Sequence, residues 1–415
     1  MDFLGIHLTL LIGPSVPLPA PVGLMEALEE VEVHTGDDRS GFQIRFQVGR
    51  SGPADLLDYA LLASPLLQTW NRVIVIVTFN ATPRVLMDGF VTQREFSASH
   101  EPGRSFVTLT GDDVSVKLDL EEKSAEHVGL DDGLVALKLI GSYAEYGLIP
   151  KLIPPPVIDP PLPIDRVPVQ LRTDLEHLRF LALRHGYVFY IVPGPVPMTN
   201  TAYWGPPVRA GLPQSAITVN MGPNSNVTDF SVHSNGLGPT QVSGKVQDRL
   251  TNQTLPVRLF ASLRPPLAAL PAWLVDQPNV RTTRFRESGV DAMQAYGRAQ
   301  ALLEDSMDLV VANGELDALR YGDILQPRGV VGVRGAGYLH DGLWYVKNVR
   351  HRIRKENYSQ SFTLAREGWG STVPVVTGRH VPLSSACGQG VERPEMALPS
   401  CLGRTGRWQW ATACR

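Results

Sequence analysis

Hydrophobic and polar residues alternate along the first part of the chain in the manner of β-strands. "EVEVH" from residue 30 and "FQIRFQV" from residue 42 both alternate, and a period of two places successive side chains on opposite faces of a sheet. The polar face of the second run holds Gln43, Arg45 and Gln47. "RVIVIVTFN" from residue 72 is typical of a strand buried on both faces, and strands follow over 88–96 and 105–111. The pattern predicts an antiparallel β-barrel or sandwich over the first 111 residues, within a first domain over residues 1–120, with a short helix over 53–62.

The middle of the chain changes to helical patterns. We expect a helix over residues 133–147 with Asp132 as its N-cap, and then eight prolines between residues 148 and 169 disfavour any regular element. A linker is therefore predicted at 150–168. Thr173 and Glu176 form a capping box for the next helix, and Gly186 suits the left-handed position that ends it before a strand over 187–192. These features define a helix-containing middle domain over 121–216.

A second β-rich region follows and is interrupted by another helix. Strand patterns cover residues 215–222, 226–234 and 240–248, and they resume over 307–316 and 342–366. Between them a helix is expected over 288–306, with Ser288 as its N-cap. We therefore predict a second, split β domain from residues 217–250 and 306–367, an insertion over 251–305, and an irregular tail over 368–415. The fold class is mainly β with α+β insertions.

A short internal repeat connects the two β-rich regions. Asp88-Gly89 is followed by a strand, a polar turn and "SFVTL" from residue 105, and Asp341-Gly342 is followed by a strand, a polar turn and "SFTL" from residue 361. Two related β domains in one chain would explain this similarity.

Candidate chemistry is sparse. Asp174, Glu176, His177 and His185 lie in one helix, but their spacing is not that of a zinc peptidase, and capping and solvent exposure explain them better. His351 lies on the hydrophobic face of its strand and is interpreted as structural. On the opposite face the stripe Arg350, Arg352 and Arg354 would bind phosphate, line a charged channel, meet an acidic partner or simply face solvent. We expect no catalytic set, no metal and no cofactor.

Composition narrows the class of protein further. The 415 residues carry a net charge of −3 with a pI near 6.4, which gives no general attraction to nucleic acid or to a membrane surface. The three cysteines, Cys387, Cys401 and Cys414, all lie in the last thirty residues, which fits assembly in a reducing cytoplasm. The opening "MDFLGIHLTLLIG" lacks the basic start of a signal peptide and is interpreted as a buried strand.

Several stretches resemble one protein family when taken in order. "TDLEHLRFLALRHGYVFYI" from residue 173 resembles the helix-to-strand segment of the late control protein D family, the baseplate hub proteins of contractile phage tails and injection systems. "FQIRFQVGR", "YWGPP", "GPNSNVTDFSV", "YGDILQPRG" and "GLWYVKNVRHRIRKENYSQSFTLAR" follow the same order. The resemblance covers residues 1–367.

This resemblance implies a structural, non-enzymatic hub protomer with two tube-like β-barrel domains, the second split by an insertion. A homotrimer would then present six similar barrels, adapting a hexameric inner tube to a trimeric spike. The implied partners are further copies of the chain, the inner tube protein, a VgrG-like spike protein supplied as a separate chain, and other baseplate proteins. The particle would be a phage tail or injection device assembled in the bacterial cytoplasm. Gln43, Arg45 and Gln47, and likewise Arg350, Arg352 and Arg354, are candidates for lumen or subunit surfaces.

Two other classes compete with the hub hypothesis. A tail-associated cell-wall hydrolase would need two carboxylates facing each other across a cleft, and the sequence indicates no segment that sets up such a pair. A secreted β-rich adhesin or other binding module is disfavoured by the cysteine-free body and by the character of the first residues.

Overall fold

The structure is a computed structural model that is mainly β, with few helices and large antiparallel sheets, which confirms the predicted fold class. The predicted tail, with its three cysteines, lies almost entirely outside the described part, and residues 378–415 form a unit separate from 1–377. The described residues are 2–3, 6–36, 39–49, 61–79, 81–101, 104–156, 163–164, 167–238, 240–248, 251–274, 280–287 and 289–373.

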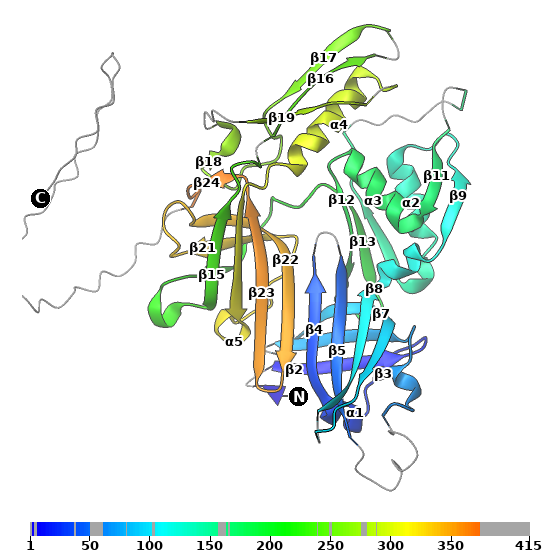
Figure 1. The fold of residues 1–415 in the computed structure, drawn as a ribbon, viewed down its shortest axis with the longest axis vertical. Helices are drawn as coiled ribbons and strands as arrows, with labels where there is room; N and C mark the ends of the chain where they lie inside the picture. The colour runs from blue at the N-terminus through cyan, green and yellow to red at the C-terminus, as the bar shows by residue number, and fades with distance from the viewer. Residues whose placement is uncertain are drawn as a thin grey trace, which may run out of the picture. The chain divides into compact units, whose positions relative to one another are not determined.

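A fourteen-stranded sheet forms the centre of the protein (Figure 1). Its first half consists of β1 (Asp2–Phe3), β2 (Ile6–Gly13), β3 (Leu18–Pro19), β4 (Leu28–Thr35), β5 (Ser40–Val48), β6 (Arg72–Phe79), β7 (Thr82–Ser97) and β8 (Ser105–Asp113). Its second half consists of β14 (Gln214–Thr218), β15 (Val227–Ser234), β20 (Val310–Asp317), β21 (Val330–Arg334), β22 (Gly342–Arg354) and β23 (Asn357–Arg366). The halves are joined by antiparallel pairing of β4 with β22.

Alternating side chains divide each half into a buried and a polar face. In β5 the residues alternate between buried and exposed or half-buried along the whole strand, as its sequence predicts. The buried residues of β2, β4, β5, β6 and β8 form one hydrophobic core, and a second core gathers buried residues from β20, β21, β22 and β23. Ile353 of β22 and Tyr358 of β23 belong to the first core, so the two halves meet through side chains as well as through backbone hydrogen bonds.

The middle of the chain follows β8 and packs against Phe90 of β7. It contains η3 (Val114–Asp119), β9 (Glu122–Glu126), α2 (Asp132–Gly141), η4 (Ala144–Tyr146), β10 (Leu148–Leu152), β11 (Val169–Thr173), α3 (Asp174–Arg184), β12 (Val188–Pro193) and β13 (Asn200–Gly205). Strands β10, β13 and β12 form one small sheet, and β9 and β11 form a two-stranded ribbon. A separate core of side chains from η3, α2, α3, β12 and β13 holds this region together.

Local signals in this region are partly confirmed and partly corrected. The Thr173 hydroxyl accepts a hydrogen bond from the Glu176 backbone N–H at 3.2 Å, and Gly186 has the predicted positive φ of 65°. The helix before it is capped by Asp131, not Asp132, because the Asp131 carboxylate accepts from the Leu134 N–H. Pro150 lies inside β10, so the predicted linker begins later; β10 is an edge strand, where a missing N–H is tolerated.

An insertion between β15 and β20 carries its own sheet and helix. Strands β16 (Thr240–Gln247), β17 (Thr254–Leu259) and β19 (Arg281–Arg284) form the sheet, and α4 (Ala292–Asp305) packs on one face of it. The sequence interpretation grouped residues 240–250 with the second barrel, but β16 pairs only within this sheet. Asp291 caps α4 through the Gln294 N–H, whereas the predicted cap, Ser288, and residues 53–60 of the helix predicted over 53–62 lie outside the described residues.

The remaining elements are short. They are α1 (Val22–Ala27), η2 (Pro65–Leu67), η5 (Gly222–Asn224), β18 (Leu270–Pro271), η6 (Ala272–Leu274), α5 (Ala318–Tyr321) and β24 (Gly368–Trp369). Among the helices in the described ranges, none is both long and hydrophobic enough to cross a membrane.

Candidate interaction surface

The predicted arginine stripe lies on the polar face of β22 and meets carboxylates of β4. Arg352 Nη2 lies 2.5 Å from Glu32 Oε1, and Arg354 Nε lies 2.8 Å from Glu30 Oε1. The nearby Glu30 carboxylate raises the pKa of Arg354. Arg350 is more distant, with 4.0 Å between its Nε and Glu32 Oε2. The stripe is therefore half of a cross-strand charge ladder, which disfavours its use as a phosphate site.

The second set of candidates lies on the same face, on the other side of β4. Gln43 is opposite Glu32, and Arg45 is opposite Glu30, in the β4–β5 pairing. Arg45 also stacks over the Phe106 ring at 3.8 Å from its centroid. The two sets that the sequence presented separately thus form one polar surface across β5, β4 and β22.

Sequence reasoning missed Glu30 and Glu32 as part of this surface. The signal was present, because both alternate with valine in "EVEVH". Their significance depends on which strand lies beside β4, and that strand, β22, is more than 300 residues away along the chain.

The structure confirms the prediction that His351 is a buried, structural residue. It is buried on the opposite face of β22, and its Nδ1 lies 3.0 Å from the Tyr358 hydroxyl oxygen. Burial lowers the pKa of His351 to about 3, so the imidazole is neutral in the folded protein at neutral pH.

The two halves of the main sheet repeat the same strand order. The order runs β7-β8-β5-β4 in the first half and β22-β23-β20-β15 in the second half. The repeated sequences fall on equivalent strands: Phe96 is opposite Val107 in the β7–β8 pair, and Val349 is opposite Phe362 in the β22–β23 pair. The weak sequence repeat therefore corresponds to two structural units of four strands each.

Equivalent positions differ in how well the rest of the chain covers them. Val349 is 0% exposed because β4 lies beside β22, whereas its equivalent Phe96 is 40% exposed. Val31 of β4 is buried against β22, whereas its equivalent on β15, Val232, is only partly buried. Within the described residues, no strand pairs with the outer edge of Gln93–Ser97 or with that of β15. The polar surface thus ends in two open strand edges.

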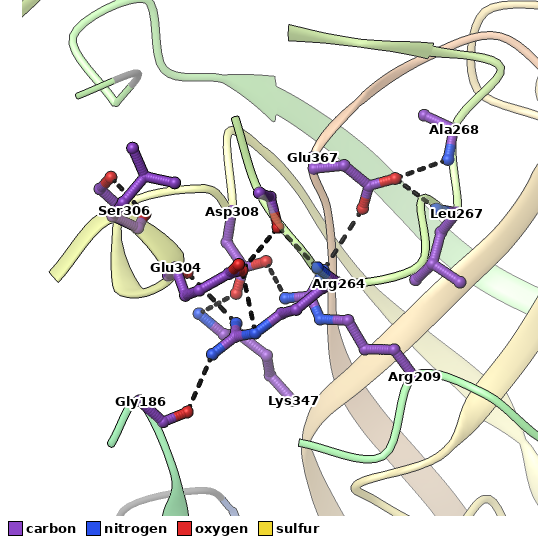
Figure 2. A network of polar contacts seen from close by, with 12 residues as sticks. Gly186, Arg209, Arg264, Leu267, Ala268, Glu304, Ser306, Asp308, Lys347 and Glu367 are labelled. Atoms are coloured by element: carbon purple, nitrogen blue, oxygen red, sulfur yellow. Dashed lines mark hydrogen bonds and ion pairs between the residues drawn. The ribbon is translucent and has the colours of Figure 1, made fainter. Parts of the chain in front are cut away.

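A buried ionic network fastens the insertion and the preceding loop to the second half (Figure 2). Arg209 contacts both Asp308 and Glu367, and Glu367 in turn accepts hydrogen bonds from the Leu267 and Ala268 N–H groups. Although burial opposes ionisation, Arg209 and Lys347 lower the pKa of Asp308 to about 2. The Asp308 carboxylate is therefore an ionised counterion of these cations.

A cavity of about 470 Å³ adjoins this network. Its lining combines Arg264, Glu304 and Asp308 with α3 and β12 residues, and Arg264 Nε lies 3.1 Å from Glu304 Oε2. Arg264 also donates to the Gly186 carbonyl oxygen at 3.1 Å, which ties the insertion to the middle of the chain. Glycoside hydrolysis needs an acid with a raised pKa. The lowered pKa of Asp308 gives no support to that chemistry here.

The acidic and histidine residues of α3 are only partly as predicted. Asp174 is fully buried and accepts hydrogen bonds from Lys123, Tyr143 and Gln170, so the expectation of solvent exposure is wrong for it. His177 is also buried, and burial lowers its pKa to about 4. In the described part of the chain, no cluster of three or more metal-ligating side chains is present.

Comparison with known proteins places the fold among phage tail proteins. A tail protein from Neisseria meningitidis MC58 matches with a TM-score of 0.60 at 14% identity, over 88% of this chain and 98% of its own. The 43 kDa tail protein of prophage MuSo2 from Shewanella oneidensis matches with a TM-score of 0.60 at 12% identity, over 87% and 98%.

A chain of the lidded Francisella PdpA–VgrG complex matches with a TM-score of 0.52 at 9% identity, over 90% of this chain but only 54% of its own. No family model matches the sequence, and no curated protein matches it. The chain therefore has the fold of phage and prophage tail proteins, as its sequence resemblance suggested. The low identities support the fold alone.

Proposed function

We propose that the protein is a structural, non-enzymatic baseplate hub of a contractile tail or injection particle. Copies of the chain form a homotrimeric ring that adapts a hexameric inner tube to a trimeric spike. The observation that carries this proposal is the pair of equivalent four-strand units, whose outer edges pair with no strand of the described residues over Gln93–Ser97 of β7 and along β15. Units that contact one another head to tail form a closed ring when the rotation from one unit to the next is a whole fraction of a full turn.

The β4–β22 junction inside the chain serves as the template for the contact between copies. β15 is equivalent to β4, and β7 is equivalent to β22, so β15 of one copy pairs with β7 of the next. By this equivalence, β15 of a neighbouring copy covers Phe96, as β4 covers Val349 within the chain. Three copies then supply six similar units, which matches a hexameric tube on one side and a threefold spike on the other.

The polar face of these units lines the lumen in this arrangement. Gln43, Arg45 and Gln47 and the arginines of β22 would face the passage, with Glu30 and Glu32 balancing the arginine charge. A lumen with mixed, paired charges lets a polar cargo pass without binding it tightly. The inner tube protein and the VgrG-like spike would attach at the two ends of the ring, with other baseplate proteins outside, and assembly would take place in the bacterial cytoplasm.

The test compares two equivalent positions. Phe96→Asp places a charge at the proposed contact between copies and should convert the trimer into a folded monomer, as measured by light scattering and circular dichroism. Leu137→Asp is a matched control, because Leu137 is similarly exposed at 43% but lies on α2 of the middle region rather than on either edge. A wild-type protein that stays monomeric and does not capture the spike protein would contradict the hub proposal.

A further inference from the structure

The insertion exposes a basic sheet face. Cross-strand pairing places Arg258 of β17 and Arg284 of β19 on either side of Ser243, and Lys245 follows two residues along β16 on the same face. All three cations are exposed, and within the described residues no carboxylate pairs with any of them. The opposite face of the sheet is hydrophobic and packs on α4.

This face differs from an ordinary solvent-exposed sheet face in its unbalanced positive charge and in its exposed aromatic residue. Its other polar positions are Gln241, Ser243, Gln247, Thr254 and Thr282, and Phe260 continues it at 65% exposure. Neighbouring strands are about 4.8 Å apart, so the Arg258 and Arg284 Cα atoms are separated by about 10 Å. A row of like charges without counterions destabilises the isolated sheet, and an acidic partner would relieve that repulsion.

The chain carries a complementary surface on the β9–β11 ribbon. Glu122, Ser124 and Glu126 point to solvent from β9, and Val169 and Leu171 lie opposite them on β11, with Leu171 72% exposed. Four residues of extended strand place Glu122 and Glu126 about 13 Å apart. The ribbon thus presents two carboxylates beside an exposed apolar pair, which mirrors the cations and Phe260 of the insertion.

Within one chain, α3 separates the two surfaces. It contacts both α4 of the insertion and β11 of the ribbon (Figure 1). Between copies the situation differs. The insertion follows the edge strand β15, and the ribbon follows β8, the neighbour of β7. Pairing of β15 with β7 of the next copy therefore brings the insertion of one copy beside the middle region of the next.

We infer that the basic face of the insertion binds the acidic β9–β11 ribbon of a second copy, outside the lumen. This inference rests on the proposed ring and names the surfaces that fix the contact between its copies. The charged rows set register and orientation, and the exposed Phe260, Val169 and Leu171 provide the apolar area that is removed from water.

A charge exchange in the full-length protein tests the inference. One variant carries Lys245→Glu, Arg258→Glu and Arg284→Glu, a second carries Glu122→Lys and Glu126→Lys, and a third combines all five. Concentration-dependent light scattering at low salt should show about tenfold weaker self-association for each of the first two, and near wild-type association for the third. The control, with Arg84, Lys138 and Arg334 changed to Glu, should associate like the wild type.

The results separate the inference from the ring itself. If the wild type forms trimers and all variants form them equally well, the inference is overturned while the ring stands. If the cation variant is impaired but the combined variant is not rescued, the basic face binds another acidic partner, and the inference is again overturned. If the wild type itself remains monomeric, the proposed ring fails.

Cross-linking gives a readout that does not depend on affinity. Two differently tagged copies, one with Arg258→Cys and one with Glu122→Cys, are mixed after Cys387, Cys401 and Cys414 have been changed to Ser. A disulfide between the two tags supports the contact. A copy with Lys138→Cys in place of Glu122→Cys measures the background of disulfide formation. A disulfide yield no higher than this background contradicts the contact.

Discussion

The two halves of the main sheet share a strand order but differ in what connects the strands. In the first half, β4 passes to β5 through residues 36–39, whereas in the second half residues 235–309 lie between β15 and β20. The first half instead continues from β8 into the middle region. In the proposed trimer, the shared strands would supply six equivalent units, and the unequal connections would leave only threefold symmetry outside them. One duplicated unit can therefore serve both symmetries.

The largest expected difference between the halves concerns Val349 and Phe96. Val349→Asp buries a charge in the core of the second half and should destabilise folding by about 4 kcal/mol or more. Phe96→Asp should change the free energy of unfolding by less than about 1 kcal/mol, because its side chain already reaches solvent. Urea unfolding of both variants at a concentration where the protein is monomeric measures this difference, and equal losses would contradict it.

Asp88 and Asp341 occupy the same place in the repeat but hold different partners. Asp88 makes two hydrogen bonds with buried Arg72, at 2.7 and 2.8 Å. Asp88→Asn leaves that guanidinium buried without its counterion and should cost about 3–5 kcal/mol. Asp341 accepts from the Ala336 N–H, which an amide oxygen can replace, so Asp341→Asn should cost about 1 kcal/mol. Thermal unfolding of the pair checks the ranking.

His351 should make folding sensitive to acid. Its pKa in the folded state, about 3, lies below the ordinary value of 6.5. The unfolded chain therefore binds the proton first, and the stability present above pH 6.5 is lost as the pH falls below it. The loss should be about 1.4 kcal/mol per pH unit, or roughly 2–3 kcal/mol between pH 6.5 and 4.5. His351→Gln should flatten this part of the stability profile, whereas His100→Gln, which removes an exposed histidine, should leave it as in the wild type.

The charge ladder on the polar face should contribute least to folding. Arg352 and Arg354 are almost half exposed, so each substitution with Ser should cost about 0.2–1 kcal/mol. If the face lines the lumen, their reversal to Glu should disturb particle assembly or cargo passage much more than folding. Intact, infective or injecting particles with both residues reversed would argue against the lumen assignment.

The sequence by itself determined the local structure and the fold class. The alternation in "FQIRFQV" predicted a strand with Gln43, Arg45 and Gln47 on its polar face, and the Thr173 cap and the Gly186 stop were read from neighbouring residues. These features depend on contacts a few residues apart, so their physical causes are visible in a short window of sequence. The order of several such segments also carried the resemblance to tail proteins.

Only the tertiary structure decided what these segments do together. Pairing of β4 with β22 unites two candidate sets into one polar face and supplies Glu30 and Glu32 as partners of the arginines. Tertiary structure also decided that β16 belongs to the sheet of the insertion, where it presents a basic face. Likewise, Asp174 is buried because Lys123 and Tyr143, which are distant in the sequence, form hydrogen bonds with it. Strand pairing uses backbone groups that every residue carries, so a strand's own sequence specifies its faces but not the neighbour at its edge.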